Sequence, residues 1–320
     1  MRTPSESESP RRSVFGNYTP EDADAAVAVA PYTRSTPSAL PLQEGIDRAV
    51  CRGFVYRYLA QAFDYPNAEA WRWLCSAAIR ETLGNAVAGS GRKPSSDSER
   101  KSADANLSAA LESVLAATVP EALESFRDDY IAVFGHGARG SCPINEIEYG
   151  ELRADPLFQP HRLADLGAFY RAFGLEFADG GERPDHLSVE LEFMAVLALR
   201  EAQALEHQLV EDEHAVNRSA ETTFLREHLG RWAPAFCRRV ARALPAGACA
   251  ALAGLLGAWI ESECRRVGVP SGSTDLSLRP VDEGAESICA SCGITELPPG
   301  ADHDAESPTS PASCHAPFAG

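Results

Sequence analysis

Apolar residues recur at helical spacing along most of residues 46–266, and no stretch of this region alternates apolar and polar residues as a half-buried strand does. Leu225, Leu229, Trp232 and Phe236 show the pattern clearly. A helix with one apolar face has to bury that face against another element, and here the other elements are also helices. We therefore predict an all-α, bundle-like domain of about eight to ten helices, judged by typical helix lengths.

Composition predicts where this domain begins and ends. Residues 1–42 are rich in Ser, Pro, Thr and Ala, and residues 268–320 in Gly, Pro, Ser and acidic residues. Such segments bury too little apolar surface to fold, so we predict disordered extensions at both ends. Residues 43–267 then form a single helical domain. Within it, the Gly- and Ser-containing stretch 84–104 reads as a flexible insertion.

Two segments bear on membranes and export. The uncharged run from Ala243 to Ile260 is long enough to consider as a membrane span, but it consists mainly of Ala and Gly, which favours a buried helix. Arg11, Arg12 and Phe15 resemble part of a twin-arginine export signal. The apolar run that follows, Ala25 to Ala30, is shorter than the core of a signal peptide. We predict a cytoplasmic protein without a membrane span.

Charge and cysteine content narrow the class of function. The net charge is −17 and the only lysines are Lys93 and Lys101, which argues against nucleic-acid binding and suits basic peptides. The chain has nine cysteines, an odd number, and five of them lie in predicted helices, which is typical of a reducing compartment rather than of a disulfide framework. The sequence contains no phosphate-binding loop, no dinucleotide fingerprint and no GxSxG nucleophile turn. The sequence therefore offers no recognisable nucleotide-binding or acyl-transfer site.

The most distinctive local feature is a polar loop that leads directly into a strongly helical segment at Leu187. Pro184 disfavours helix at the residue before it and so ends the loop. Asp185 is expected to be the N-cap of the helix, with His186 beside it. From the residues alone two interpretations stay open. The pair is either a simple helix cap or a carboxylate and an imidazole held at a functional site.

Metal binding is the alternative function, at one of three sets of residues. A metalloenzyme could use Asp185, His186 and Glu190, or the helix face of His207, Glu211 and His214. In the predicted C-terminal extension, a CxxC pair and a later Cys-His pair could bind zinc or another soft metal. These residues are Cys289, Cys292, Cys314 and His315.

Five blocks of sequence, in this order, resemble the TorD/DmsD/NarJ group of chaperones for molybdenum-containing redox enzymes. They are Tyr130 to Gly135, Cys142 to Gly150, Leu163 to Leu175, Glu182-Arg183-Pro184-Asp185-His186-Leu187, and Glu190-Leu191-Glu192-Phe193-Met194. The resemblance covers roughly residues 46–266, and its combination of blocks is more specific than any one of them. The extensions and the Cys-bearing tail depart from the family pattern.

The resemblance implies a fold, a function and a site. Such chaperones are cytoplasmic and not catalytic, and they need no cofactor of their own. They bind the apo-form of a molybdoenzyme catalytic subunit and its twin-arginine signal peptide, and hold it from export until the molybdopterin cofactor is inserted. Pro184, Asp185 and His186 are the positions that carry over from the family motif. The resemblance does not identify the client enzyme.

The chemistry of such a peptide indicates further site residues. Two arginines and an apolar stretch require carboxylates beside an apolar groove. We predict that Glu182, Asp185 and Glu148 receive the guanidinium groups and that Tyr149 and Tyr170 contact the apolar part. A homodimer is left open.

Overall fold

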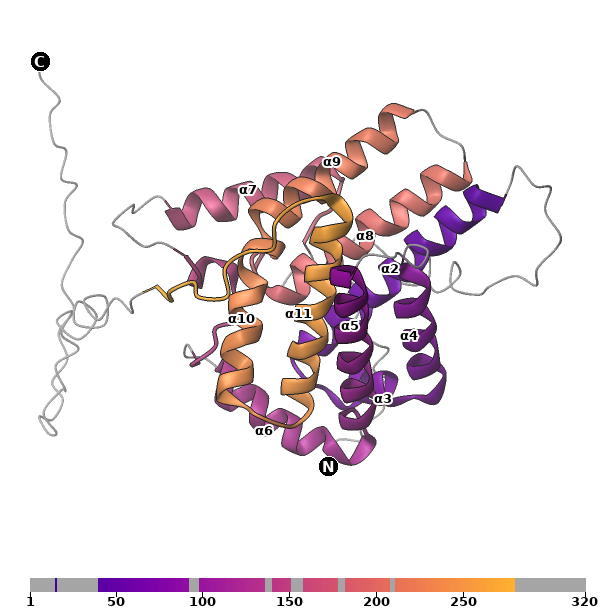
Figure 1. Ribbon diagram of the computed structural model, residues 1–320. Coiled ribbons are helices and arrows are strands. Elements are labelled where there is room, and N and C mark those ends of the chain that lie inside the picture. The colour runs from indigo at the N-terminus through magenta and orange to yellow at the C-terminus, as the bar shows by residue number, and fades with distance from the viewer. Residues whose placement is uncertain are drawn as a thin grey trace, which may run out of the picture. The chain divides into compact units, whose positions relative to one another are not determined.

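The computed structural model describes Phe15 and residues 40–91, 98–135, 140–150, 158–177, 182–207 and 211–279, without the side chains of 40, 98–100, 158–159 and 211–214 (Figure 1). These residues contain ten α-helices and two short 3-10 turns, and their only β pairings are isolated bridges. The prediction of an all-α fold is confirmed. The elements are α2 (Leu40–Phe63), α3 (Ala68–Cys75), α4 (Ala77–Ser90), α5 (Ser98–Ala117), η1 (Pro120–Ala122), α6 (Leu123–Phe134), η2 (Glu146–Glu148), α7 (Phe158–Ala172), α8 (Leu187–Glu206), α9 (Glu211–Glu227), α10 (Leu229–Ala243) and α11 (Ala248–Val267).

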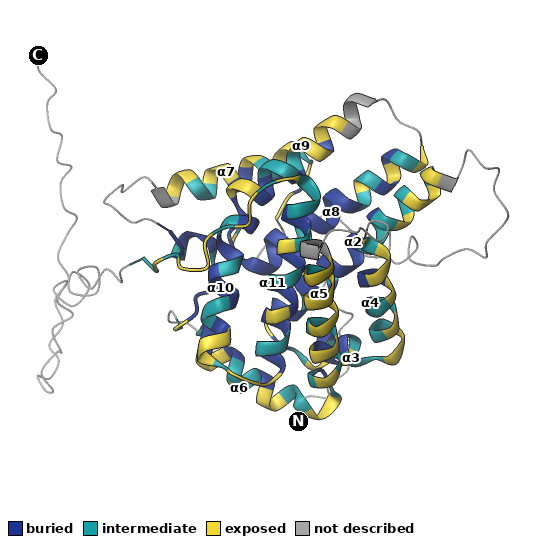
Figure 2. Ribbon diagram, in the orientation of Figure 1, coloured by how far each residue is buried: buried dark blue, intermediate teal, exposed yellow. Residues whose placement is uncertain are grey.

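Helix α8 is the central element of the core. From Leu187 to Ala198 every residue except Glu192 is buried, and Figure 2 shows this half of the helix mainly in dark blue. A helix that is apolar all round has to be enclosed by other helices. Helix α2 packs along α8 most extensively, with α9 and α10 beside it. The N-terminal end of α8, where the motif with Asp185 and His186 lies, is therefore held by the core.

The stretch 84–104 is not a flexible insertion as a whole. Helix α4 continues to Ser90 and α5 begins at Ser98, so only 92–97 falls outside the described residues. Leu83 and Val87 are buried, and a Cβ atom on Gly89 would lie 2.8 Å from Sγ of Cys51 in α2. The glycine and serine content that suggested a loop instead permits close packing of α4 on α2.

The chain continues past the predicted boundary at residue 267 along the surface of α10 and η2, as far as Arg279. The N–H of Gly272 donates to the carbonyl of Gly230 at 2.9 Å, and that of Gly150 donates to Ser277 at 3.1 Å. An added Cβ on Gly272 would lie 2.0 Å from the carbonyl oxygen of Arg231, so this position requires glycine. Main-chain contacts of this kind leave no signal in composition.

The predicted buried helix after Ala243 is present as α11. Leu252, Leu256 and Trp259 are buried against the neighbouring helices. Within the described ranges, no helix combines the length and the apolar character needed to cross a bilayer.

Candidate functional site

Two loops that are distant in the sequence pair at the start of α8. The N–H of Glu146 donates to the carbonyl of Asp185 at 2.8 Å, and the N–H of Leu187 donates to Ile144 at 3.0 Å. Asn145 and His186 form an isolated antiparallel bridge. The Cys142–Gly150 block and the Asp-His block therefore form one structural unit.

His186, and not Asp185, is the N-cap of α8, which corrects the expectation from the sequence. Its Nδ1 accepts the N–H of Ser188 at 3.3 Å and lies 2.7 Å from the Ser188 hydroxyl. Burial, together with the charge of Arg183, lowers the pKa of His186 to about 4. The imidazole is therefore neutral at pH 7, and its role is to orient the loop and the first turn of the helix.

Asp185 is fully buried and already binds a guanidinium group. Arg183 donates to its two carboxylate oxygens from Nε at 3.0 Å and from Nη2 at 3.1 Å. The N–H of Ile147 approaches one of these oxygens at 3.4 Å. Burial raises the pKa of Asp185, although Arg183 acts to lower it. The Arg183 side chain is 51% exposed, whereas that of Asp185 is fully buried.

The other predicted residues divide into two groups. Tyr170 adjoins the motif, because its hydroxyl donates to the carbonyl of Pro184 at 2.8 Å. Glu182 and Glu148 are half-buried. Tyr149 and Tyr170 are both fully buried. The Tyr149 hydroxyl donates to the carbonyl of Pro143 at 2.7 Å, and its ring centroid lies 5.1 Å from that of Trp232, so Tyr149 supports the loop from the core.

Two buried carboxylates, Glu146 and Glu190, lie close to the loops. The sequence analysis did not single out Glu146, and it considered Glu190 only as a possible metal ligand. Burial acts to raise the pKa of Glu146. A hydrogen bond from His228 at 3.0 Å and the charge of the neighbouring Arg231 nevertheless keep this pKa below its usual range. Burial, reinforced by the nearby charge of Glu146, raises the pKa of Glu190 well above its usual range, even though Trp232 donates to it at 3.0 Å. The surroundings of Glu146 therefore favour its ionised form, whereas those of Glu190 favour its protonated form.

The raised pKa of Glu190 predicts that Glu190→Gln stabilises the protein by an amount that depends on pH. The unfolded chain loses this proton near pH 4.5 while the folded chain keeps it, so the parent loses stability as pH rises. Glutamine cannot ionise and still accepts from Trp232. We expect the gain in the free energy of unfolding to grow with pH, by at most about 1.4 kcal/mol per pH unit. Urea unfolding at about pH 5 and about pH 8 measures it, with the exposed Glu206→Gln of the same helix as control. An equal change at both pH values would contradict the assignment.

The geometry does not bring together the metal ligands predicted at this site. Asp185 faces Arg183, His186 faces Ser188 and Glu190 faces Trp232. In the part of the chain that the structure describes, no three His, Cys, Asp or Glu side chains are grouped to hold a metal ion. The remaining candidates lie at least partly outside the described residues or side chains: Glu211, His214, Cys289, Cys292, Cys314 and His315.

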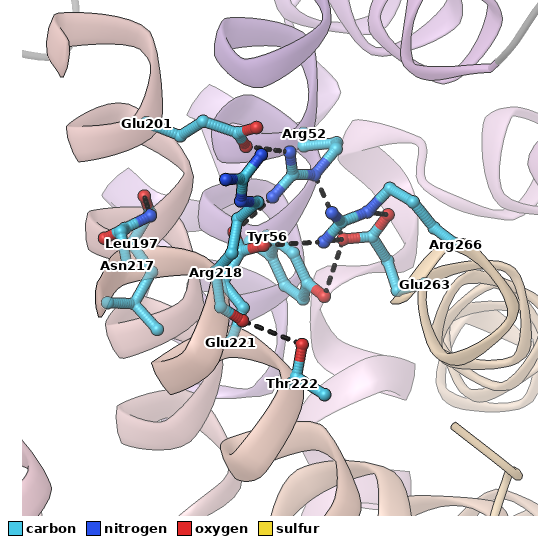
Figure 3. A network of polar contacts seen from close by, with 10 residues as sticks. All are labelled: Arg52, Tyr56, Leu197, Glu201, Asn217, Arg218, Glu221, Thr222, Glu263 and Arg266. Atoms are coloured by element: carbon cyan, nitrogen blue, oxygen red, sulfur yellow. Dashed lines mark hydrogen bonds and ion pairs between the residues drawn. The ribbon is translucent and has the colours of Figure 1, made fainter. Parts of the chain in front are cut away.

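A second polar centre lies toward the other end of α8 (Figure 3). Arg52 of α2 contacts Glu201 of α8 and Glu221 of α9, and its Nε lies 3.1 Å from Glu263 of α11. Arg266 of α11 bridges Glu221 at 3.0 Å and Glu263 at 2.8 Å. The ion pairs therefore join α2, α8, α9 and α11. Sequence reasoning missed them, because each charge lies on an otherwise ordinary amphipathic helix.

A cavity of about 430 Å³ lies beside this network, with Arg48, Asp104 and Arg218 in its wall. Glu201 lies 14 positions after Leu187 in the sequence, so at 1.5 Å per residue the two are separated by roughly 20 Å along α8. The cavity is therefore distinct from the paired loops. Its wall carries charges of both signs, which indicates no single class of ligand.

Comparisons with known proteins identify the family. Residues 99–238 match the family described as nitrate reductase delta subunit. The selenate reductase assembly chaperone protein of Thauera selenatis is 31% identical over 188 residues, which are 58% of this chain and 74% of that protein. The chain belongs to this family. The matched region includes both loops of the site, and the resemblance to the TorD/DmsD/NarJ group is confirmed.

Other relatives in this family carry similar names. The chlorate reductase assembly chaperone protein of Ideonella dechloratans is 28% identical over 202 residues, 61% of this chain and 79% of that protein. The dimethyl sulfide dehydrogenase assembly chaperone protein of Rhodovulum sulfidophilum is 45% identical over 82 residues, 24% of this chain and 32% of that protein. These relatives are named for assembly and not for catalysis. No solved structure matches the chain.

Proposed function

We propose that this protein is a cytoplasmic assembly chaperone for a molybdopterin-containing oxidoreductase. It binds the twin-arginine signal peptide and the apo-form of the catalytic subunit and holds it from export until the cofactor is inserted. The observation that carries the proposal is the similarity to the selenate reductase assembly chaperone over 74% of that protein's length. The protein itself catalyses no reaction in this scheme.

Arginine exchange at Asp185 is the step that we propose for peptide recognition. The buried carboxylate is held between the two loops and binds Arg183, which is half exposed. When an arginine of the peptide replaces Arg183, the carboxylate keeps a charge-assisted hydrogen bond and Arg183 moves into water. The buried carboxylate is never left without a cation. We expect the apolar part of the peptide to bind near Tyr170 and Pro184, which a hydrogen bond joins next to Asp185.

Asp185→Asn is expected to weaken binding of a synthetic twin-arginine signal peptide by about 10- to 100-fold, which corresponds to the loss of one or two charge-assisted hydrogen bonds. Asparagine is preferred to alanine because it retains an acceptor for the N–H of Ile147. Isothermal titration calorimetry measures the affinity, and circular dichroism checks that the helices are retained. A peptide with a lysine pair should bind more weakly to the parent, since lysine lacks the bidentate geometry.

Arg183→Ala is the matched control, because it removes the competitor and keeps the carboxylate. It should bind the same peptide at least as tightly as the parent does. Equal affinities of the parent and Asp185→Asn would show that Asp185 does not receive the peptide arginine.

Two further proposals concern parts outside the described residues or beyond one chain. A soft metal such as zinc at Cys289, Cys292, Cys314 and His315 stays a prediction, and so does a homodimer. Neither is needed for the binding step at Asp185.

A further inference from the structure

Phe15 lies far before the first described helix in the sequence, yet its side chain is completely buried. Its ring centroid lies 5.3 Å from that of Tyr170 and 5.5 Å from that of Phe177, and the latter two are 5.4 Å apart. The rings are tilted or edge-on to one another, as in favourable aromatic clusters. Phe15 therefore fills an aromatic seat made by Tyr170 and Phe177.

The backbone contributes to the same contact. Phe15 and Phe177 form an isolated antiparallel bridge, so Phe15 pairs with the domain through its backbone as well as through its ring. Extended peptides commonly bind in this way, with backbone pairing for affinity and a side-chain pocket for specificity. Tyr170 connects the seat to the site, because its hydroxyl donates to Pro184 next to Asp185. The aromatic seat and the paired loops are thus joined by a direct hydrogen bond.

The sequence around Phe15 has the chemistry of the proposed ligand. Arg11 and Arg12 precede Phe15 by four and three positions. Three residues of extended chain span at most about 10 Å, so an arginine pair at this spacing can reach acidic groups next to the seat. Glu176 is exposed and adjoins Phe177 in the sequence, and Glu182 is half-buried before Pro184. The arginine pair and the phenylalanine of the N-terminal sequence therefore match, in charge and in apolar character, the acidic residues and the aromatic seat of the domain.

We propose that the Tyr170–Phe177 seat takes the aromatic residue that follows an arginine pair, and that Phe15 of the chain itself occupies it when no client is bound. The N-terminal segment is then an intramolecular competitor of the client's signal peptide. This inference rests on the proposed function and adds a way in which binding of the signal peptide is regulated. A tethered competitor has a high effective concentration, so only a peptide that binds more tightly than the segment displaces it. Phe15 also covers the aromatic surface of the seat when no client is bound.

The test uses the full chain with Phe15→Ala and two synthetic peptides in calorimetry. One peptide has the sequence of residues 5–20, and the other is a twin-arginine signal peptide. We expect each to bind the variant at least ten-fold more tightly than the parent, because the seat is empty. A residues 5–20 peptide with alanine in place of Phe15 should not bind. Val216→Ala, at a side chain that is 62% exposed on α9, is the control and should bind as the parent does.

A measurement on the parent removes any dependence on the folding of the variant. Hydrogen exchange of backbone amides in residues 10–20 should become faster when saturating signal peptide is added. Unchanged exchange in the presence of bound signal peptide would overturn the competition.

The outcomes separate this inference from the proposed function. If the residues 5–20 peptide does not bind Phe15→Ala, the seat is not a peptide site and the inference fails. If the signal peptide binds the parent and Phe15→Ala equally, the chaperone function stands and the competition is overturned. If the residues 5–20 peptide binds Phe15→Ala but the signal peptide binds neither protein, the intramolecular contact stands and the proposed ligand is wrong.

Discussion

Arg52→Met is expected to lower the free energy of unfolding by about 3–5 kcal/mol, because it leaves buried carboxylates without their main cation. Arg52 is the cation that contacts Glu201, Glu221 and Glu263 (Figure 3). Burial alone would lower its pKa, but these three carboxylates raise it well above its usual value, so the guanidinium stays charged. Methionine fills similar volume and supplies no charge.

The same substitution at Arg48, one helical turn earlier in α2, is the control. The Arg48 side chain is 36% exposed and lies 4.0 Å from Glu44, so Arg48→Met should cost at most about 1 kcal/mol. Urea unfolding followed by circular dichroism at pH 7 measures both variants. A similar small loss for Arg52→Met would show that the network contributes little to stability.

The loss in the free energy of unfolding caused by Arg52→Met should also become smaller in acid. In the parent, Arg52 and Arg266 hold the pKa of Glu263 below its usual range despite burial. A carboxylate with a lowered pKa stabilises the fold above its unfolded pKa, and that contribution is lost as pH falls through the folded pKa. The parent loses this contribution in acid, whereas the variant has only the part that Arg266 supplies. The difference between the two proteins therefore becomes smaller below about pH 4.

Trp232→Ala is expected to destabilise the domain by about 3–5 kcal/mol, the usual cost of removing a large buried aromatic side chain. Trp232 is fully buried, with its ring centroid 5.1 Å from Tyr149 and 5.7 Å from Phe236. It also donates its indole N–H to the carboxyl group of Glu190. The substitution therefore removes both the support of the first loop and the partner of a buried acid.

Two companion variants separate these contributions. Trp232→Phe keeps an aromatic ring but removes the N–H group that donates to Glu190. We expect it to lower the free energy of unfolding by about 1–3 kcal/mol, because Glu190 loses its hydrogen-bond donor and a small cavity is left. Trp73→Ala, at a half-buried tryptophan of α3, should cost less than Trp232→Ala. Urea unfolding at pH 7 measures all three. A loss for Trp232→Ala no larger than that for Trp73→Ala would contradict the central place of Trp232.

The helices were predictable because their signal is local. Regular spacing of residues such as Leu252, Leu256 and Trp259 indicates a buried helical face whatever the partner is. The stretch 84–104 was misread because Gly89 and the nearby serines are typical of loops. Close packing against Cys51 of α2 outweighs their poor helix propensity. The end of the domain was placed too early because the contacts of Gly272 depend on α10.

The helical class, the family and the position of the Asp-His motif can be predicted from sequence, since each of these is carried by residues close together in the chain. What the motif residues do depends on the tertiary structure. It makes His186 the cap and binds Asp185 to Arg183, and it buries Glu190 against Trp232. It also brings Phe15 to Tyr170. Burial, ionisation and occupancy of a site depend on groups contributed by distant segments, and the packing of the helices alone determines which groups those are.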